Sequence, residues 1–146
     1  MRIIPINNKQ TNFGSYYPLT EEEIYSRFGT TRGEHINHAM TDLVPIAHID
    51  GAGLDVIVKT IENKDKFEKG IVIAVADEKS NICCDYILHG NMKNCPHVKG
   101  SIFLKDVPHL EMLSKVVCDT AKGLIEAFKN ADKNPKLFEY YSKIFK

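Results

Sequence analysis

Residues 70–90 read GIVIAVADEKSNICCDYILHG, and this stretch decides the fold. Two runs of β-forming residues, 71–76 and 82–89, flank the polar residues 77–81. A short polar connection of this kind is typical of two antiparallel strands. The pattern therefore predicts that the two runs form a β-hairpin at the centre of a sheet.

Two further runs extend the predicted sheet along the chain. Residues 54–61 follow the turn-forming residues 50–53 and alternate in side-chain character as a strand does. Residues 101–105 form the other run, after a connection over residues 90–100. Because a parallel crossover needs a much longer connection than these, we expect an antiparallel meander of about four strands.

Two short helices are expected before the sheet. Thr20 and Glu23 have the spacing of a capping box, so the first helix begins there, and it ends at Gly29. The second helix begins at another pair with capping-box spacing. It ends before a proline, because the helical conformation is disfavoured for the residue that precedes proline. The residues that mark the second helix are Thr31, Glu34 and Pro45.

The C-terminal third is expected to be helical, because apolar residues recur there at every third or fourth position. One helix starts near Pro108, and a last helix follows Asn134 and Pro135. We therefore predict one α+β domain over residues 18–146, in which C-terminal helices cover the antiparallel meander and the two N-terminal helices lie beside it. Residues 1–17 are expected to form a flexible arm that contains a short edge strand.

Charge and hydropathy narrow the choice of partners and compartment. The 146-residue chain has 19 Lys and Arg against 19 Asp and Glu, so nucleic acid and anionic membranes are disfavoured as partners. The longest apolar run, residues 71–76, is far shorter than the roughly 20 residues of a membrane-spanning helix, and the N-terminus has no signal-peptide pattern. We therefore expect a soluble cytoplasmic protein.

The cysteines favour an intracellular protein with reduced thiols, and the first residues give a hint of its origin. Cys83 and Cys84 are adjacent on a predicted strand and face opposite sides, so they are poorly placed to bond each other. The opening Ile4-Pro5-Ile6, followed by QTNFG at residues 10–14, resembles the leaders of otherwise unrelated bacterial proteins. This resemblance implies a bacterial origin and specifies no activity.

The sharpest candidate for chemistry is one face of the second N-terminal helix. His35, His38 and Asp42 fall within an arc of about 60° when successive residues turn by about 100°. Two imidazoles and a carboxylate suit zinc or another divalent ion with positions left for water, so the three residues are both catalytic and metal-binding candidates. The alternative is a solvated face on which His38 and Asp42 form an ordinary i,i+4 pair.

The start of the same helix suits a small anionic ligand. Thr30, Thr31, Arg32 and Gly33 offer backbone N–H groups, two hydroxyls and a guanidinium, which bind phosphate or carboxylate well. A plain helix junction explains these residues equally well. An anion next to His35 would form a phosphoester site, so the enzymatic alternative is a small metal-dependent or phosphoester-directed hydrolase that uses Arg32, His35, His38 and Asp42.

A second group of metal-binding residue types lies in and after the predicted hairpin. Cys83 is about 20 Å from His89 along a strand, too far to share one ion. Only His89, Cys95 and His97 are therefore candidates to converge on a metal, although their spacing matches no zinc finger or ribbon. Cys95 and His97 could also act as a thiol nucleophile and its base, but a loop cysteine near a histidine is commoner without that role.

The last predicted helix has more apolar side chains than one buried stripe requires. Tyr140, Tyr141 and Phe145 either dock deeply on the domain or contact a protein partner or a second copy. No group of residues has the specificity that a catalytic assignment demands. The sequence therefore favours a small binding or interaction protein without enzymatic activity, of unidentified ligand, with a divalent metal as the one cofactor that its residues suggest.

Overall fold

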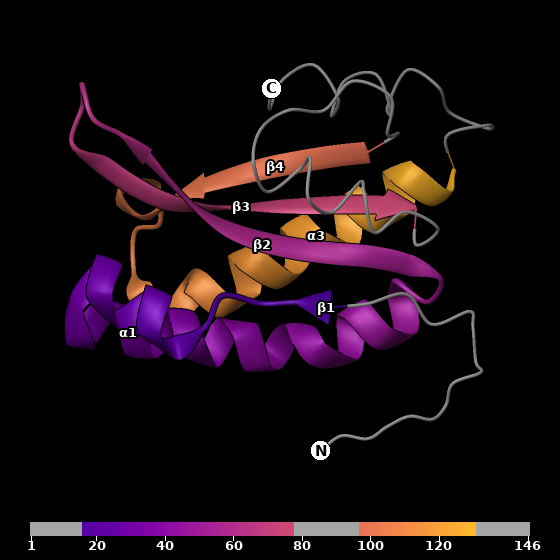
Figure 1. Cartoon of the computed structure of the whole chain (residues 1–146), viewed down its shortest axis with the longest axis horizontal. Helices are drawn as coiled ribbons and strands as arrows, with labels where there is room; N and C mark the ends of the chain where they lie inside the picture. The colour runs from indigo at the N-terminus through magenta and orange to yellow at the C-terminus, as the bar shows by residue number, and fades with distance from the viewer. Residues whose placement is uncertain (1–15, 78–96, 131–146) are drawn as a thin grey trace.

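The computed structural model describes residues 16–77 and 97–130 and shows two helices packed on a four-stranded sheet (Figure 1). The strands lie in the order β1-β2-β3-β4; β2, β3 and β4 are antiparallel neighbours, and β1 is parallel to β2. The main elements are β1 (Tyr16–Tyr17), α1 (Glu21–Pro45), β2 (Leu54–Asn63), β3 (Glu68–Asp77), β4 (His97–Phe103) and α3 (Leu113–Lys129). The fold class α+β and the antiparallel order of the last three strands are confirmed.

The partners of the central strand differ from the expected hairpin. β3 pairs over its whole length with β2, from Leu54↔Asp77 to Asn63↔Glu68. Its other edge pairs with β4, from Gly70↔Phe103 to Ala76↔His97. Residues 71–76 therefore have both hydrogen-bonding edges occupied, and the expected pairing with residues 82–89, which lie outside the described residues, is wrong. The fourth strand of the sheet is the parallel β1, whose residues Tyr16 and Tyr17 were assigned to the arm.

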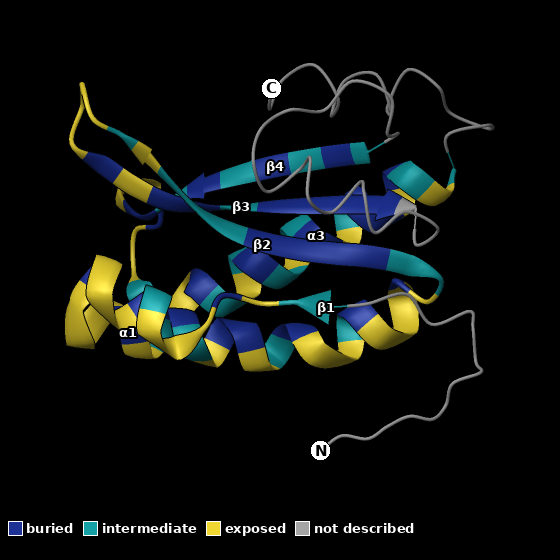
Figure 2. Ribbon diagram, in the orientation of Figure 1, coloured by how far each residue is buried: buried dark blue, intermediate teal, exposed yellow. Residues whose placement is uncertain are grey.

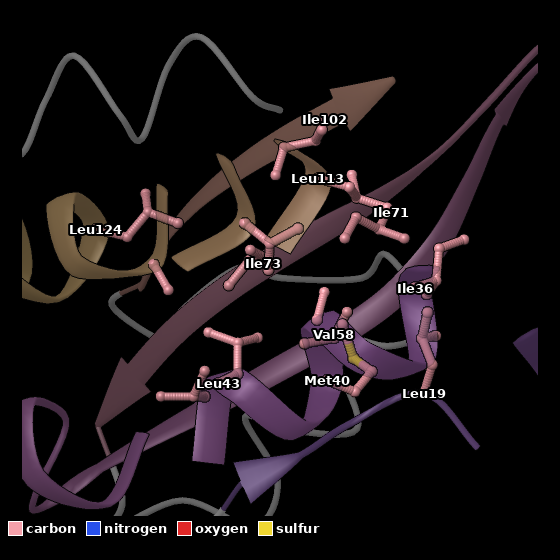
Figure 3. Packing of buried hydrophobic residues seen from close by; sticks show 14 of the residues in the cluster. Leu19, Ile36, Met40, Leu43, Val58, Ile71, Ile73, Ile102, Leu113 and Leu124 are labelled. Atoms are coloured by element: carbon pink, nitrogen blue, oxygen red, sulfur yellow. The ribbon is translucent and has the colours of Figure 1, made fainter. Parts of the chain in front are cut away.

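One face of the sheet forms the main core with the helices. Alternate residues of β2 and β3 point to this face, where Figure 3 shows Met40 near Val58. Burying a large aliphatic side chain contributes about 1.5–3 kcal/mol, so this layer supplies most of the stability. The fully buried large residues of the core are Ile24, Ile36, Leu43, Val56, Val58, Ile71, Ile73, Val75, Val98, Leu113 and Leu124.

The opposite face of the sheet holds a smaller cluster. Ile57 and Ala74 are cross-strand neighbours that are almost completely buried, and Tyr17 packs against them. Residues Asp55–Val58 of β2 are thus buried on both faces in succession, and Figure 2 shows the buried colour running along the middle of β2 and β3.

Helix α1 is one element with a break at Gly29, where the two expected N-terminal helices meet. The capping box at its start is confirmed: the Glu23 backbone N–H donates to Thr20 Oγ1 and the Thr20 N–H donates to Glu23 Oε1, both at 3.1 Å. The bond from the Thr20 N–H is the main cause that lowers the pKa of Glu23. Gly29 has φ 81° and ψ −176°, a conformation that favours glycine, so the helix changes direction there.

The helix does not end before Pro45 as the sequence predicted. Pro45 is the last residue of α1, and the chain then continues as a π-helical turn, η2 (Ile46–Asp50), instead of leaving the helical conformation. The Gly51 N–H donates to the Ile46 carbonyl at 2.9 Å, which is the i→i+5 bond of a π-helix.

The C-terminal helical pattern is confirmed as far as the structure describes it. Two short 3₁₀ turns, η3 (Leu104–Asp106) and η4 (Leu110–Met112), lead from β4 into α3. The predicted last helix after Asn134 lies outside the described residues. Neither described helix is long and apolar enough to cross a membrane.

Replacing Gly29 with Ala tests the break in α1. An added Cβ meets no atom within 4 Å, so the effect comes from the backbone alone. We expect Gly29→Ala to lower the free energy of unfolding by about 1–3 kcal/mol, because the left-handed conformation is strained for alanine. Urea denaturation measures the change.

The neighbouring exposed Thr30 provides the control for that substitution. Thr30→Ala removes no strained conformation and should shift stability by less than about 1 kcal/mol. A gain in stability for Gly29→Ala, as expected in a regular helix, would show that the two segments of α1 form one straight helix.

Candidate functional site

The structure brings together two of the three residues of the helix-face hypothesis and adds a third from another helix. His38 Nε2 lies 3.3 Å from Asp42 Oδ2, as the i,i+4 spacing predicted. The Ser114 hydroxyl of α3 donates to the same carboxylate oxygen. Asp42 thus contacts side chains of both helices at the point where α3 crosses α1, and it stays partly open to solvent.

The polar contacts continue inward from Asp42 toward the core. Cys118 lies one turn after Ser114; burial raises the pKa of its thiol, the hydrogen bond with Ser114 lowers it, and the negative charge of Asp42 raises it, with a net increase. The Tyr16 hydroxyl donates to the Met40 carbonyl at 2.8 Å. Burial, and then the charge of Cys118, raise the pKa of Tyr16. We call the group His38, Asp42, Ser114, Cys118 and Tyr16 the α1–α3 polar cluster.

The chemistry available to this cluster depends on which side chain donates each hydrogen bond and which accepts it. In a hydrolase triad the serine donates to histidine, whereas here Ser114 and His38 both contact the Asp42 carboxylate. The Asp42 carboxylate accepts the hydrogen bond of the Ser114 hydroxyl, while Cys118 stays a protonated thiol and a weak nucleophile at neutral pH.

The metal hypothesis on the helix face lacks its third ligand. His35 is seven residues before Asp42, about 10 Å along the helix axis, and is not part of the His38–Asp42 pair. Within residues 16–77 and 97–130, no group of three or more His, Cys, Asp or Glu side chains is placed to hold a metal ion.

The expected anion-binding residues lie just after the break in α1. Thr30, Thr31 and Arg32 are exposed, and Gly33 is buried. The reason for a glycine at position 33 is packing: a Cβ would lie 2.7 Å from the ring of Tyr25. Arg32 is also ten residues from Asp42, about 15 Å along the axis, so the residues of the proposed phosphoester site are spread over several turns.

The remaining predicted residues are mostly beyond the described ranges. His97 is the first residue of β4 and is partly buried. Of the second metal group, His89 and Cys95 lie outside the described residues. So do the interface candidates Tyr140, Tyr141 and Phe145.

Among the residues that the structure describes, the most exposed large apolar side chain belongs to a residue that the sequence did not single out. Phe67 closes the turn between β2 and β3, is 91% exposed and has φ 55°. Two weak turn bonds shape this tip, from the Lys66 N–H to the Asn63 carbonyl and from the Phe67 N–H to the Lys64 carbonyl. Figure 2 shows the tip as an exposed loop projecting beyond the sheet. We call residues 64–67 the hairpin tip.

Three polar contacts hold the base of the hairpin. Lys59 Nζ lies 3.2 Å from Glu23 Oε2, and Lys69 Nζ donates to the Arg27 carbonyl at 2.8 Å, so both connect the hairpin to the first segment of α1. On the other side, Lys105 Nζ lies 2.6 Å from the largely buried Glu68 carboxylate. The tip is therefore carried by a fixed base.

A second exposed apolar surface lies at the end of α1. Ile49 of η2 is 72% exposed and Val44 is 40% exposed, about one helical turn earlier. The sequence predicts that the helix ends before Pro45 and gives no signal of this turn. We call Val44 and Ile49, with the neighbouring exposed Asp50, the η2 surface.

Comparisons with known proteins give no relative of this chain. No protein family, no characterised protein and no solved structure matches it. The fold and the sites are therefore interpreted from their own geometry.

Replacing Asp42 tests the α1–α3 polar cluster through the thiol of Cys118. In a background with serine at the other three cysteines, Asp42→Asn removes a negative charge that raises the thiol pKa. We expect the pKa to fall and Cys118 to be alkylated several-fold faster by iodoacetamide at pH 8, because the thiolate is the reacting form. The rate is measured by mass spectrometry.

Ser114→Ala serves as a control of opposite sign. Its hydroxyl lowers the thiol pKa, so its removal should slow alkylation. Equal rates in the parent protein and both variants would show that the three side chains are not coupled.

Proposed function

We propose that this chain is an interaction protein without enzymatic activity, and that Phe67 at the hairpin tip is its main contact residue. The observation that supports this is the placement of a large aromatic side chain, 91% exposed, in a left-handed backbone conformation. That conformation is an outlier for a bulky residue and costs about 1–2 kcal/mol. Glycine or asparagine would adopt this turn conformation at lower cost, so the presence of phenylalanine at position 67 does not serve the stability of the fold.

The fixed base of the hairpin favours binding over free motion. The contacts of Lys59, Lys69 and Glu68 order the strands on both sides of the tip before any partner arrives. A pre-ordered element loses less conformational entropy on association. An aromatic side chain on a projecting element suits an apolar surface of another protein molecule, because aromatic residues are frequent among the few that dominate interface energies.

Phe67→Asn separates binding from folding. Asparagine tolerates the left-handed conformation, so we expect stability to be unchanged or higher by on the order of 1 kcal/mol. Capture of a partner by the immobilised protein from an extract should be lost, since truncating an aromatic anchor commonly weakens binding by about tenfold or more. Quantitative mass spectrometry compares the captured proteins.

The matched control is Met112→Asn, which changes another exposed apolar side chain away from the tip. Proteins captured by the parent and by this control, but not by Phe67→Asn, support the proposal. Capture of the same set of proteins by all three, or loss of stability in Phe67→Asn, contradicts it.

A second candidate function is a small hydrolase centred on Asp42. The contact of both the Ser114 hydroxyl and His38 with one carboxylate oxygen favours it, since Asp42 could accept a proton from a nucleophile at this place. The candidate predicts hydrolysis of p-nitrophenyl phosphate or acetate, with or without added Zn²⁺ or Mn²⁺, that Asp42→Asn abolishes. Hydrolysis that survives in Asp42→Asn would reject it.

A further inference from the structure

We infer that this chain associates with itself head to tail, the hairpin tip of one copy seating on the η2 surface of the next. The inference rests on the proposed function and names the partner of Phe67 as a second copy. It depends on three properties of the two surfaces, namely exposed apolar side chains, opposite charge and position in the fold.

Both surfaces have exposed apolar side chains, aromatic at the hairpin tip and aliphatic on the η2 surface. Phe67 is a single aromatic side chain on a projecting turn. Val44 and Ile49 are two aliphatic side chains on a helix end, both exposed. Among the described residues, the exposed large apolar side chains are these three, Tyr25 and Met112.

The charge around the hairpin tip is positive. Lys64 and Lys66 lie in the turn, and Lys69 sits at the base with its ammonium on the Arg27 carbonyl, a neutral group that leaves the charge in place. Glu68 is already paired with Lys105. The carboxylates left to balance these cations in the same part of the hairpin are Glu62 and Asp65.

The chain segment that carries the η2 surface is acidic in its sequence. Residues 33–58 contain no Lys or Arg, whereas they include the acidic residues Glu34, Asp42, Asp50 and Asp55. Asp50 follows Ile49 directly and is exposed, and Asp42 lies close before Val44 and is partly open to solvent. An aromatic side chain between lysines therefore meets aliphatic side chains between carboxylates, and such complementarity steers and orients association.

The two surfaces lie at opposite ends of the molecule. β2 begins three residues after Gly51 and runs for ten residues to the hairpin tip, about 33 Å in an extended strand. Figure 1 shows the β2–β3 turn at one end of the sheet and the end of α1 at the other. One copy is therefore unable to bring its own tip onto its own η2 surface.

This placement determines the kind of assembly. Two different surfaces in contact make a heterologous interface, which repeats into a chain of copies unless the rotation closes a ring. The contact is small, so we expect association to be weak and to require protein concentrations approaching about 1 mM. Because part of the attraction is between exposed charges, added salt should weaken it.

Analytical ultracentrifugation of the full chain tests the inference. The average mass should rise with concentration from about 10 μM to about 1 mM. Phe67→Asn and Ile49→Asn should each weaken association about tenfold or more, whereas Met112→Asn should leave it unchanged. Both altered side chains are exposed, so circular dichroism should report unchanged folding.

The mixture of the two single variants gives the decisive result. Phe67→Asn keeps its η2 surface and Ile49→Asn keeps its tip, so an equimolar mixture should form a 1:1 dimer that does not grow further. If Ile49→Asn fails to fold, the charge reversal Asp50→Lys replaces it, and pairing with a Lys64→Asp, Lys66→Asp variant should restore association.

A parent chain that stays monomeric over the whole range, or variants that associate as the parent does, overturn the head-to-tail contact. So does a mixture that fails to pair. A monomeric chain whose Phe67 still determines which proteins it captures would overturn this inference while leaving the proposed function in place.

Discussion

The rest of the structure depends on the register between β2 and β3. Ten residue pairs, from Leu54↔Asp77 to Asn63↔Glu68, fix which side chains of each strand face the helices. Because side chains alternate with a period of two, a slip of one residue would move Val56, Val58 and their partners to the opposite face. Both α1 and α3 pack on the face that this register creates, and the short turn over residues 64–67 holds it in place.

Local sequence patterns predicted where helices and strands lie better than they predicted which strands pair with each other. The caps of α1, the break at Gly29, the strand character of residues 54–61 and 71–76, and the periodicity of α3 all follow from short-range chemistry. The partner of residues 71–76 does not, because apolar runs precede and follow this strand and local pattern favours both equally. The helix end predicted at Pro45 is wrong for a different reason: the rule that proline ends a helix does not foresee the π-helical turn that follows it here.

The candidate sites show the same limit. The His38–Asp42 pair was visible as an i,i+4 spacing, but Ser114 reaches Asp42 from 72 residues away only because α3 crosses α1 there. Phe67 was visible as one aromatic residue in a polar connection. What gives it significance, its exposure and positive φ, is set by the turn that joins two specific strands. Tertiary contacts therefore decide which of the suggestive residues act together.

The separation of charge along β2 also bears on how the protein behaves in concentrated solution. The formal net charge of the whole chain is zero, so copies at neutral pH lack the long-range repulsion that keeps many proteins apart. Locally the charge is uneven, because residues 64–69 contain three lysines and two acidic residues, whereas residues 42–50 contain two aspartates and no lysine or arginine. Such a molecule is least soluble at low ionic strength and becomes more soluble as salt screens the attraction of unlike ends, so colloidal stability is set by the ionic medium.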